Sequence, residues 1–159
     1  MVFADWTCSG TGAECVLDSS IKYAGTSSFK GKAFAQSGIY SILTHNTFSE
    51  SQVQILLWVY RPGTNVYGVV GHANYGELIC SNSATATWQR FRTSFWYDAT
   101  SNTKWGRVER WDDGAWVQIG TDTNYGTGSP GAGAIYLKTV GNPFTAASNC
   151  YFDELEVYS

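Results

Sequence analysis

Aromatic and charged side chains that could recognise a sugar recur in the second half of the chain. If the strands there alternate between two faces, one side of each carries flat rings together with hydrogen-bonding groups. The set is Trp96, Trp105, Trp111, Trp116, Tyr136, Arg92, Arg107, Glu109 and Gln118. Aromatic rings stack on the C–H faces of sugars, and Arg, Glu and Gln pair with their hydroxyl groups. The pattern therefore predicts a saccharide-binding surface.

The same aromatic side chains have two other interpretations. Tryptophans often close the ends of a β-sandwich core, so we expect about two or three of the five aromatic rings in this set to be exposed. Trp6, Trp58 and Trp88 are expected in core or edge packing. Exposed Trp, Tyr and Arg also form protein interfaces. The alternative function is therefore a structural, decoration or adhesion protein of a virion or surface assembly.

Alternation along the strands decides which side of each strand is buried. Between Trp88 and Tyr97, Phe91 and Phe95 share one side and the arginines share the other. Because an unpaired buried arginine is costly, the Phe side should be the core. The Asp-Gly pair that ends at Gly114 predicts a hairpin, after which the chain returns with Val117 and Ile119 inward.

The rest of the chain also indicates strands. Charged residues make up 14% of the chain and aromatic residues 16%, and clusters of turn residues recur about every eight to fifteen residues. We expect an all-β fold, a two-sheet antiparallel β-sandwich in which residues 1–159 form one domain. The predicted strands are 14–20, 27–34, 38–43, 52–60, 66–71, 77–81, 87–98, 104–111, 115–120, 133–140 and 150–158, with 121–132 as a loop.

Four segments resemble a known pattern in the expected order. Residues 53–62 resemble an apolar-x-Trp-Val-x-Pro strand, and 88–91 resemble the Trp-x-x-apolar opening of a central strand. Residues 25–31 and 151–158 resemble the second and the closing strands. Together they resemble laminin-G-like and concanavalin A-like jelly rolls, and carbohydrate-binding modules. The resemblance implies a jelly-roll sandwich and a glycan-binding function.

The same resemblance implies a structural calcium. In these folds the ion often joins the N-terminal segment to the Asp of the final strand, which here is Asp153, with Asp5 as a partner. Carboxylate and carbonyl oxygens suit calcium. Alternatively, Asp153 only caps or pairs locally.

Four cysteines allow three pairings. We favour Cys8 with Cys15, which closes a small loop, and Cys80 with Cys150, which ties a middle strand to the last one. The alternative is four free thiols. A zinc site is the weakest interpretation, because the chain has no Cys-x-x-Cys.

No motif of catalysis is present. Retaining glucanases of similar fold carry Glu-x-Asp-x-x-Glu, and the closest approach here is Glu109 with Asp112 and Asp113 at a hairpin tip. Glu154 and Glu156 share a face, which is usual for solvated glutamates. Gly-x-Ser-x-Gly and phosphate-binding loops are also missing. We expect a protein that is not an enzyme.

Charge and hydropathy exclude other partners. The net charge is −3 and the basic residues are scattered, so neither nucleic acid nor membrane insertion is expected. The N-terminus lacks the features of a signal peptide. Met1 then follows a removed leader, or the chain never uses that route, as in a virion. The expected partner is an oligo- or polysaccharide, or protein subunits in the alternative, with an extracellular, surface-exposed or virion location.

Overall fold

The computed structural model describes residues 6–9, 15–33, 42–48, 52–64, 66–141 and 148–158. All regular structure in these ranges is β-strand, as the turn pattern predicts. None of the described residues forms a helix long and apolar enough to cross a membrane.

Thirteen strands follow one another along the described residues. They are β1 (Trp6–Ser9), β2 (Cys15–Asp18), β3 (Ser28–Ala33), β4 (Ile42–Phe48), β5 (Gln52–Tyr60), β6 (Val66–His72), β7 (Gly76–Cys80), β8 (Trp88–Asp98), β9 (Thr103–Asp112), β10 (Ala115–Gln118), β11 (Thr123–Thr127), β12 (Gly133–Gly141) and β13 (Ser148–Tyr158).

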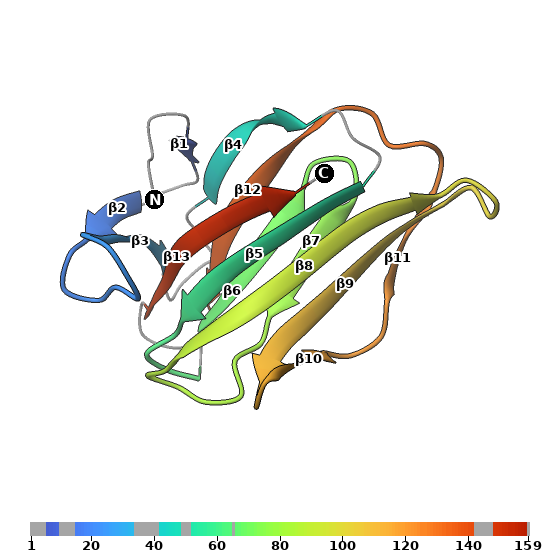
Figure 1. The fold of residues 1–159 in the computed structure, drawn as a ribbon. Helices are drawn as coiled ribbons and strands as arrows, with labels where there is room; N and C mark the ends of the chain where they lie inside the picture. Colours follow the sequence, from blue (N-terminus) through green and yellow to red (C-terminus); the bar gives the residue numbers. More distant parts are fainter. Residues whose placement is uncertain are drawn as a thin grey trace.

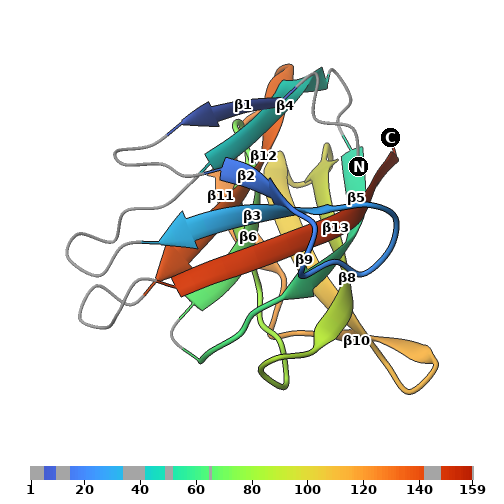
Figure 2. The ribbon, with the colours of Figure 1, turned by 90° about the vertical axis from the view of Figure 1, so that its left-hand side faces the viewer.

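The strands form two antiparallel sheets that pack face to face as a jelly-roll β-sandwich. One sheet has five strands in the order β1-β4-β12-β6-β7. The other has eight, in the order β10-β9-β8-β5-β13-β3-β2, and β11 also pairs with β9. Figure 1 looks onto the eight-stranded sheet, with β12, β6 and β7 behind it. Figure 2 shows the two layers from the side.

The core lies between the sheets and is built by strict alternation. In β5, Val53, Ile55, Leu57 and Val59 are fully buried, while the residues between them are partly exposed. The predicted inward face of β8 is confirmed, because Phe91 and Phe95 are fully buried. An apolar residue at every second position gives a strand one buried face, and this pattern selects the register.

Two local predictions are wrong at the edge beyond β9. Residues 121–132 are not all loop, because β11 pairs with the first half of β9. Val117 does not point inward but is 44% exposed, and it lies on β10, the edge strand of the eight-stranded sheet. Ile119 does pack against the core.

The N-terminal part differs from expectation in two strands. β1 was not predicted, and it pairs with β4. The strand predicted at 38–43 overlaps only the start of β4, and residues 38–41 lie outside the described residues.

The predicted bridge between Cys80 and Cys150 is wrong. Both are free thiols buried in the core, Cys80 on β7 and Cys150 on β13. The thiol of Cys150 instead lies 3.5 Å from the carbonyl oxygen of Tyr60, to which it donates. The other pairing stays a prediction, because the side chain of Cys8 lies outside the described residues.

Candidate functional site

The solvent side of β5, β8, β9, β10 and β13, here called the outer face, presents side chains in rows across the strands. Antiparallel pairing places directly opposed residues on the same side of the sheet. The rows are Tyr151, Tyr60 and Trp88; Asp153, Trp58 and Arg90; Glu156, Leu56, Arg92, Glu109 and Gln118; Tyr158, Gln54, Ser94 and Arg107; and Gln52, Trp96 and Trp105. Trp111 and Trp116 form a further pair.

The middle of the outer face is polar and its charges are held in place. Arg92 donates to both carboxylate oxygens of Glu109, with both distances 2.6 Å. Next to it, Gln54 donates to the hydroxyl group of Ser94. These rigid hydrogen-bonding groups are the type that orients a polar ligand.

A second ion pair fixes the arginine of the neighbouring row. Arg107 donates to both oxygens of Asp122 at 2.7 Å, and Gln118 donates to one of them at 2.8 Å. The hydrogen bonds from Arg107 hold the pKa of Asp122 below its usual value. Asp122 was not among the predicted site residues, because it lies in an irregular segment where alternation indicates no face.

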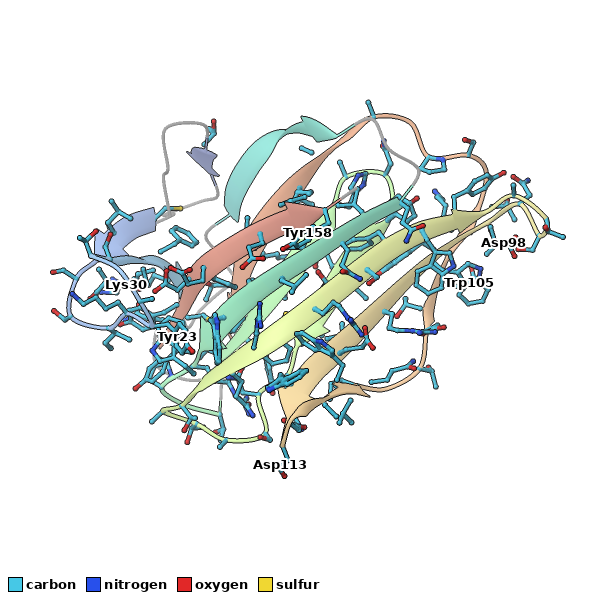
Figure 3. All side chains as sticks on the ribbon, in the orientation of Figure 1. Tyr23, Lys30, Asp98, Trp105, Asp113 and Tyr158 are labelled. Atoms are coloured by element: carbon cyan, nitrogen blue, oxygen red, sulfur yellow. The ribbon has the colours of Figure 1, made fainter. Side chains whose placement is uncertain are left out.

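One end of the outer face carries the pair Trp96 and Trp105. Their rings are nearly parallel, with centroids 6.5 Å apart, and the guanidinium of Arg107 lies 5.5 Å from the Trp96 ring. Figure 3 shows Trp105 at this end, away from Tyr23. A pocket of about 480 Å³ beside Trp96 is lined by Gln52, Gln54, Arg92, Ser94, Trp96, Arg107 and Glu109.

Trp111 and Trp116 lie further along β9 and β10. Their rings meet edge to face at 5.2 Å, and Trp111 is 41% exposed. The guanidinium of Arg92 lies over the Trp116 ring at 4.7 Å. The central ion pair is therefore also packed against an aromatic ring, which limits its movement.

A second pocket lies at this end of the outer face, and sequence reasoning missed part of it. Its volume is about 450 Å³, and Trp58, Trp88, Trp111, Arg90, Gln89, Ser83, Thr87, Asp112 and Asp113 line it. Trp58 and Trp88 were expected in the core or at its edges, but they are half-buried on the outer face. The signal was present, because Leu57 and Val59 are both inward and so Trp58 must point outward.

The two pockets follow one strand. Arg92 lines the first pocket and Arg90 the second, and these residues are two apart on the same side of β8. From Trp88 to Trp96 the strand advances about 26 Å, at about 3.3 Å per residue. The outer face thus offers an elongated surface with a polar middle and an aromatic ring at each end.

Among the predicted ligand-binding residues, Tyr136 alone does not lie on the outer face. It belongs to β12 in the five-stranded sheet, where its hydroxyl group donates to Glu77 at 3.2 Å and its ring lies over Gly71. Its alternation with Ile135 and Leu137 indicates a solvent-facing position, but alternation cannot say which sheet a strand joins.

The end of the outer face that carries Trp58 and Trp88 is bordered by the segment between β2 and β3. Tyr23 stacks on Trp58 with centroids 3.7 Å apart. Its backbone N–H and that of Ala24 donate to one carboxylate oxygen of Asp153, at 2.9 and 3.1 Å. The other oxygen accepts from the N–H of Glu154. Asp153 therefore ties this segment to the face.

The calcium predicted at Asp153 stays a prediction. Asp5 lies outside the described residues. The groups that contact Asp153 in the described part are N–H donors, which do not bind cations. Among the described residues, no group of three or more His, Cys, Asp and Glu side chains could hold a metal ion.

Comparisons by sequence found no matching family model and no matching curated protein. Comparisons by structure did find similar folds. A xylan β-1,4-xylosidase from Bacillus halodurans is 6% identical with a TM-score of 0.56, covering 83% of this chain and 33% of its own. An arabinose-bound GH51 α-L-arabinofuranosidase is 14% identical with a TM-score of 0.51, covering 98% and 23%.

Carbohydrate-binding modules are also among the similar structures. The xylan-binding domain CBM22-1 from Paenibacillus barcinonensis is 14% identical with a TM-score of 0.44, covering 96% of this chain and 83% of its own. This chain spans about a third of the xylosidase and about a quarter of the arabinofuranosidase. At these identities, the similarity to the xylosidase and the arabinofuranosidase shows a shared fold alone.

Proposed function

We propose that the chain is a non-catalytic carbohydrate-binding module whose ligand lies on the outer face. The observation that carries the proposal is the strand register, which gathers every predicted ligand residue except Tyr136 on that face. Rings at both ends would stack on sugar C–H faces, and the polar middle would pair with hydroxyl groups.

The shape of the outer face favours an extended ligand over a single sugar. Pockets at Trp96 and at Trp88 lie on the same side of one strand, with Arg90 and Arg92 between them. An oligosaccharide lying along β8 would contact both. A ligand that contacts both pockets at once binds more tightly than one that contacts either pocket alone, because its second contact forms within the same complex.

The state of the carboxylates supports binding over catalysis. Glycoside hydrolysis uses one carboxyl as a proton donor and a second as a base or nucleophile. Both oxygens of Glu109 accept from Arg92, and both oxygens of Asp122 accept from Arg107. Pairs of this kind occupy both oxygens of each carboxylate and fix its orientation. A module of this kind would act outside the cell or at its surface.

A glycan array tests the proposal. The parent protein should bind at least one glycan, and a folded Trp96→Ala, Trp105→Ala double variant should lose that signal. Circular dichroism and the melting temperature check that the variant remains folded. If the folded parent binds none of the arrayed glycans, the proposed function is wrong. The outer face is then explained by the alternative, as a contact surface for other protein subunits.

A further inference from the structure

The arginines on the outer face each lie beside a carboxylate. Arg92 and Arg107 make two-point pairs with Glu109 and Asp122. Arg90 lies 3.9 Å from a carboxylate oxygen of Glu156. These three pairs sum to zero charge. Two-point pairs between a guanidinium and a carboxylate are both strong and geometrically specific.

The two-point pairs leave few cationic donors for an acidic ligand. Recognition of a carboxylate or sulfate relies on the same two parallel N–H groups that Arg92 gives to Glu109. An incoming anion would have to displace Glu109 or lie beside it, and like charges at short distance repel. The exposed fraction of the Glu109 side chain is only 14%, so it cannot swing into solvent without losing packing.

A neutral glycan meets none of these costs. A hydroxyl group both donates and accepts, so it can bond to the free edges of a paired arginine or carboxylate. Gln52, Gln54 and Ser94 in the same pocket are uncharged donors and acceptors. The pocket is polar without presenting a net charge to its ligand.

We infer that the ligand of the outer face is an uncharged glycan, and that Glu109 and Asp122 are the residues that determine this specificity by occupying Arg92 and Arg107. The inference rests on the proposed glycan-binding function. The hydrogen bonds from Arg107 lower the pKa of Asp122, which favours the ionised form that pairs with Arg107.

Calorimetric titration with neutral and with acidic glycans tests the inference. The neutral probes are cellohexaose, mannohexaose and xylohexaose. The acidic probes are C6-oxidised cellohexaose and the hexamers of mannuronate and galacturonate. The proteins are the parent, Glu109→Gln, Asp122→Asn and, as a control on the other sheet, Glu77→Gln.

We expect the parent to bind a neutral probe with an affinity that changes less than about twofold between about 0.01 and 1 M salt. Each acidic probe should bind the parent at least about tenfold more weakly, a factor worth 1.4 kcal/mol. Glu109→Gln and Asp122→Asn should gain binding to an acidic probe that weakens as salt rises. Glu77→Gln should behave as the parent.

Two failures are distinguishable. If the parent binds an acidic probe more tightly than every neutral probe, with a strong salt dependence, the inference is overturned while the glycan-binding function stands. If the parent binds neither class, the proposed function fails first. If folded Glu109→Gln and Asp122→Asn both prefer neutral over acidic probes as strongly as the parent does, at every salt concentration, Glu109 and Asp122 do not set the specificity.

Discussion

The ring of Tyr125 fills the space into which a side chain at Gly106 would project. A Cβ added to Gly106 would lie 2.6 Å from the ring, and one added to Gly76 would lie 2.4 Å from it. The hydroxyl group of Tyr125 donates to the carbonyl of Glu77. Tyr125 of β11 therefore contacts both β9 and β7 across the edge of the sandwich, and β9 is the strand that carries Trp105.

Replacing Gly106 with alanine should destabilise the protein. The added methyl group displaces the Tyr125 ring, and overpacking of this kind costs about 1–3 kcal/mol of the free energy of unfolding. Urea unfolding measures the change. Gly63→Ala is the matched control, because no atom lies within 4 Å of an added Cβ there. Equal stability of the two variants would contradict the account of Tyr125.

His72 should make stability depend on pH. It is fully buried, Nδ1 accepts from the N–H of Asn74, and Nε2 has no partner among the described residues. Burial lowers its pKa from 6.5. Below about pH 6.5 the unfolded chain therefore binds more protons than the folded one, so the free energy of unfolding falls as the pH drops.

Chemical unfolding of the parent and of His72→Asn between pH 8 and pH 5 measures this effect. The asparagine keeps an acceptor near the N–H of Asn74 but does not titrate. The difference isolates His72, because His45, the other histidine, is present in both proteins. If the free energy of unfolding of the parent and of His72→Asn changes with pH at the same slope below about pH 6.5, His72 does not titrate as described.

Asp153 should stabilise the segment that carries Tyr23. An asparagine in its place would put an amide group against backbone N–H donors and lose charge-assisted bonds worth about 1.5–3 kcal/mol. Thermal and urea unfolding of Asp153→Asn should show a loss of that order. Glu154→Gln, an exposed neighbour on the same strand, should be near neutral. The account of Asp153 is wrong if both variants are as stable as the parent.

The core thiols should react only after unfolding. Cys80 and Cys150 are fully buried, and burial raises the pKa of the Cys150 thiol to about 12 and that of Cys80 further. Since the thiolate is the reactive form, alkylation mapped by mass spectrometry should label both only in denaturant. Rapid labelling of either in the native protein would contradict their burial.

The sequence predicts which side of a strand is buried better than it predicts which strands pair with one another. Alternation around Phe91 and Val108 places Arg92 and Trp96 of β8, and Arg107 and Trp105 of β9, outward, as the strand register has them. The same pattern around Leu57 indicates that Trp58 points outward, although its apolar character favoured the core. Tyr136 was assigned to the right side of its strand but grouped with the wrong sheet, because pairing across a long loop leaves no local pattern.

Long-range contacts explain the other differences. β11 lies in a glycine-rich stretch without apolar alternation, and it becomes a strand by pairing with β9. Asp122 enters the site through its bond to Arg107, fifteen residues earlier in the chain. Tyr23 reaches the face because Asp153, at the far end of the chain, binds its backbone N–H. None of these partners is visible in local composition or spacing.

Calorimetric titration of the strongest array glycan into matched aromatic variants tests the central claim most directly. Trp96→Ala and Trp111→Ala each remove a ring from the outer face, whereas Tyr136→Ala removes one from the opposite sheet. We expect each tryptophan variant to bind about tenfold more weakly, which corresponds to about 1.4 kcal/mol, and Tyr136→Ala to bind as the parent does. Unchanged binding in both folded tryptophan variants, with binding lost in Tyr136→Ala, would place the ligand on the other sheet and contradict the account.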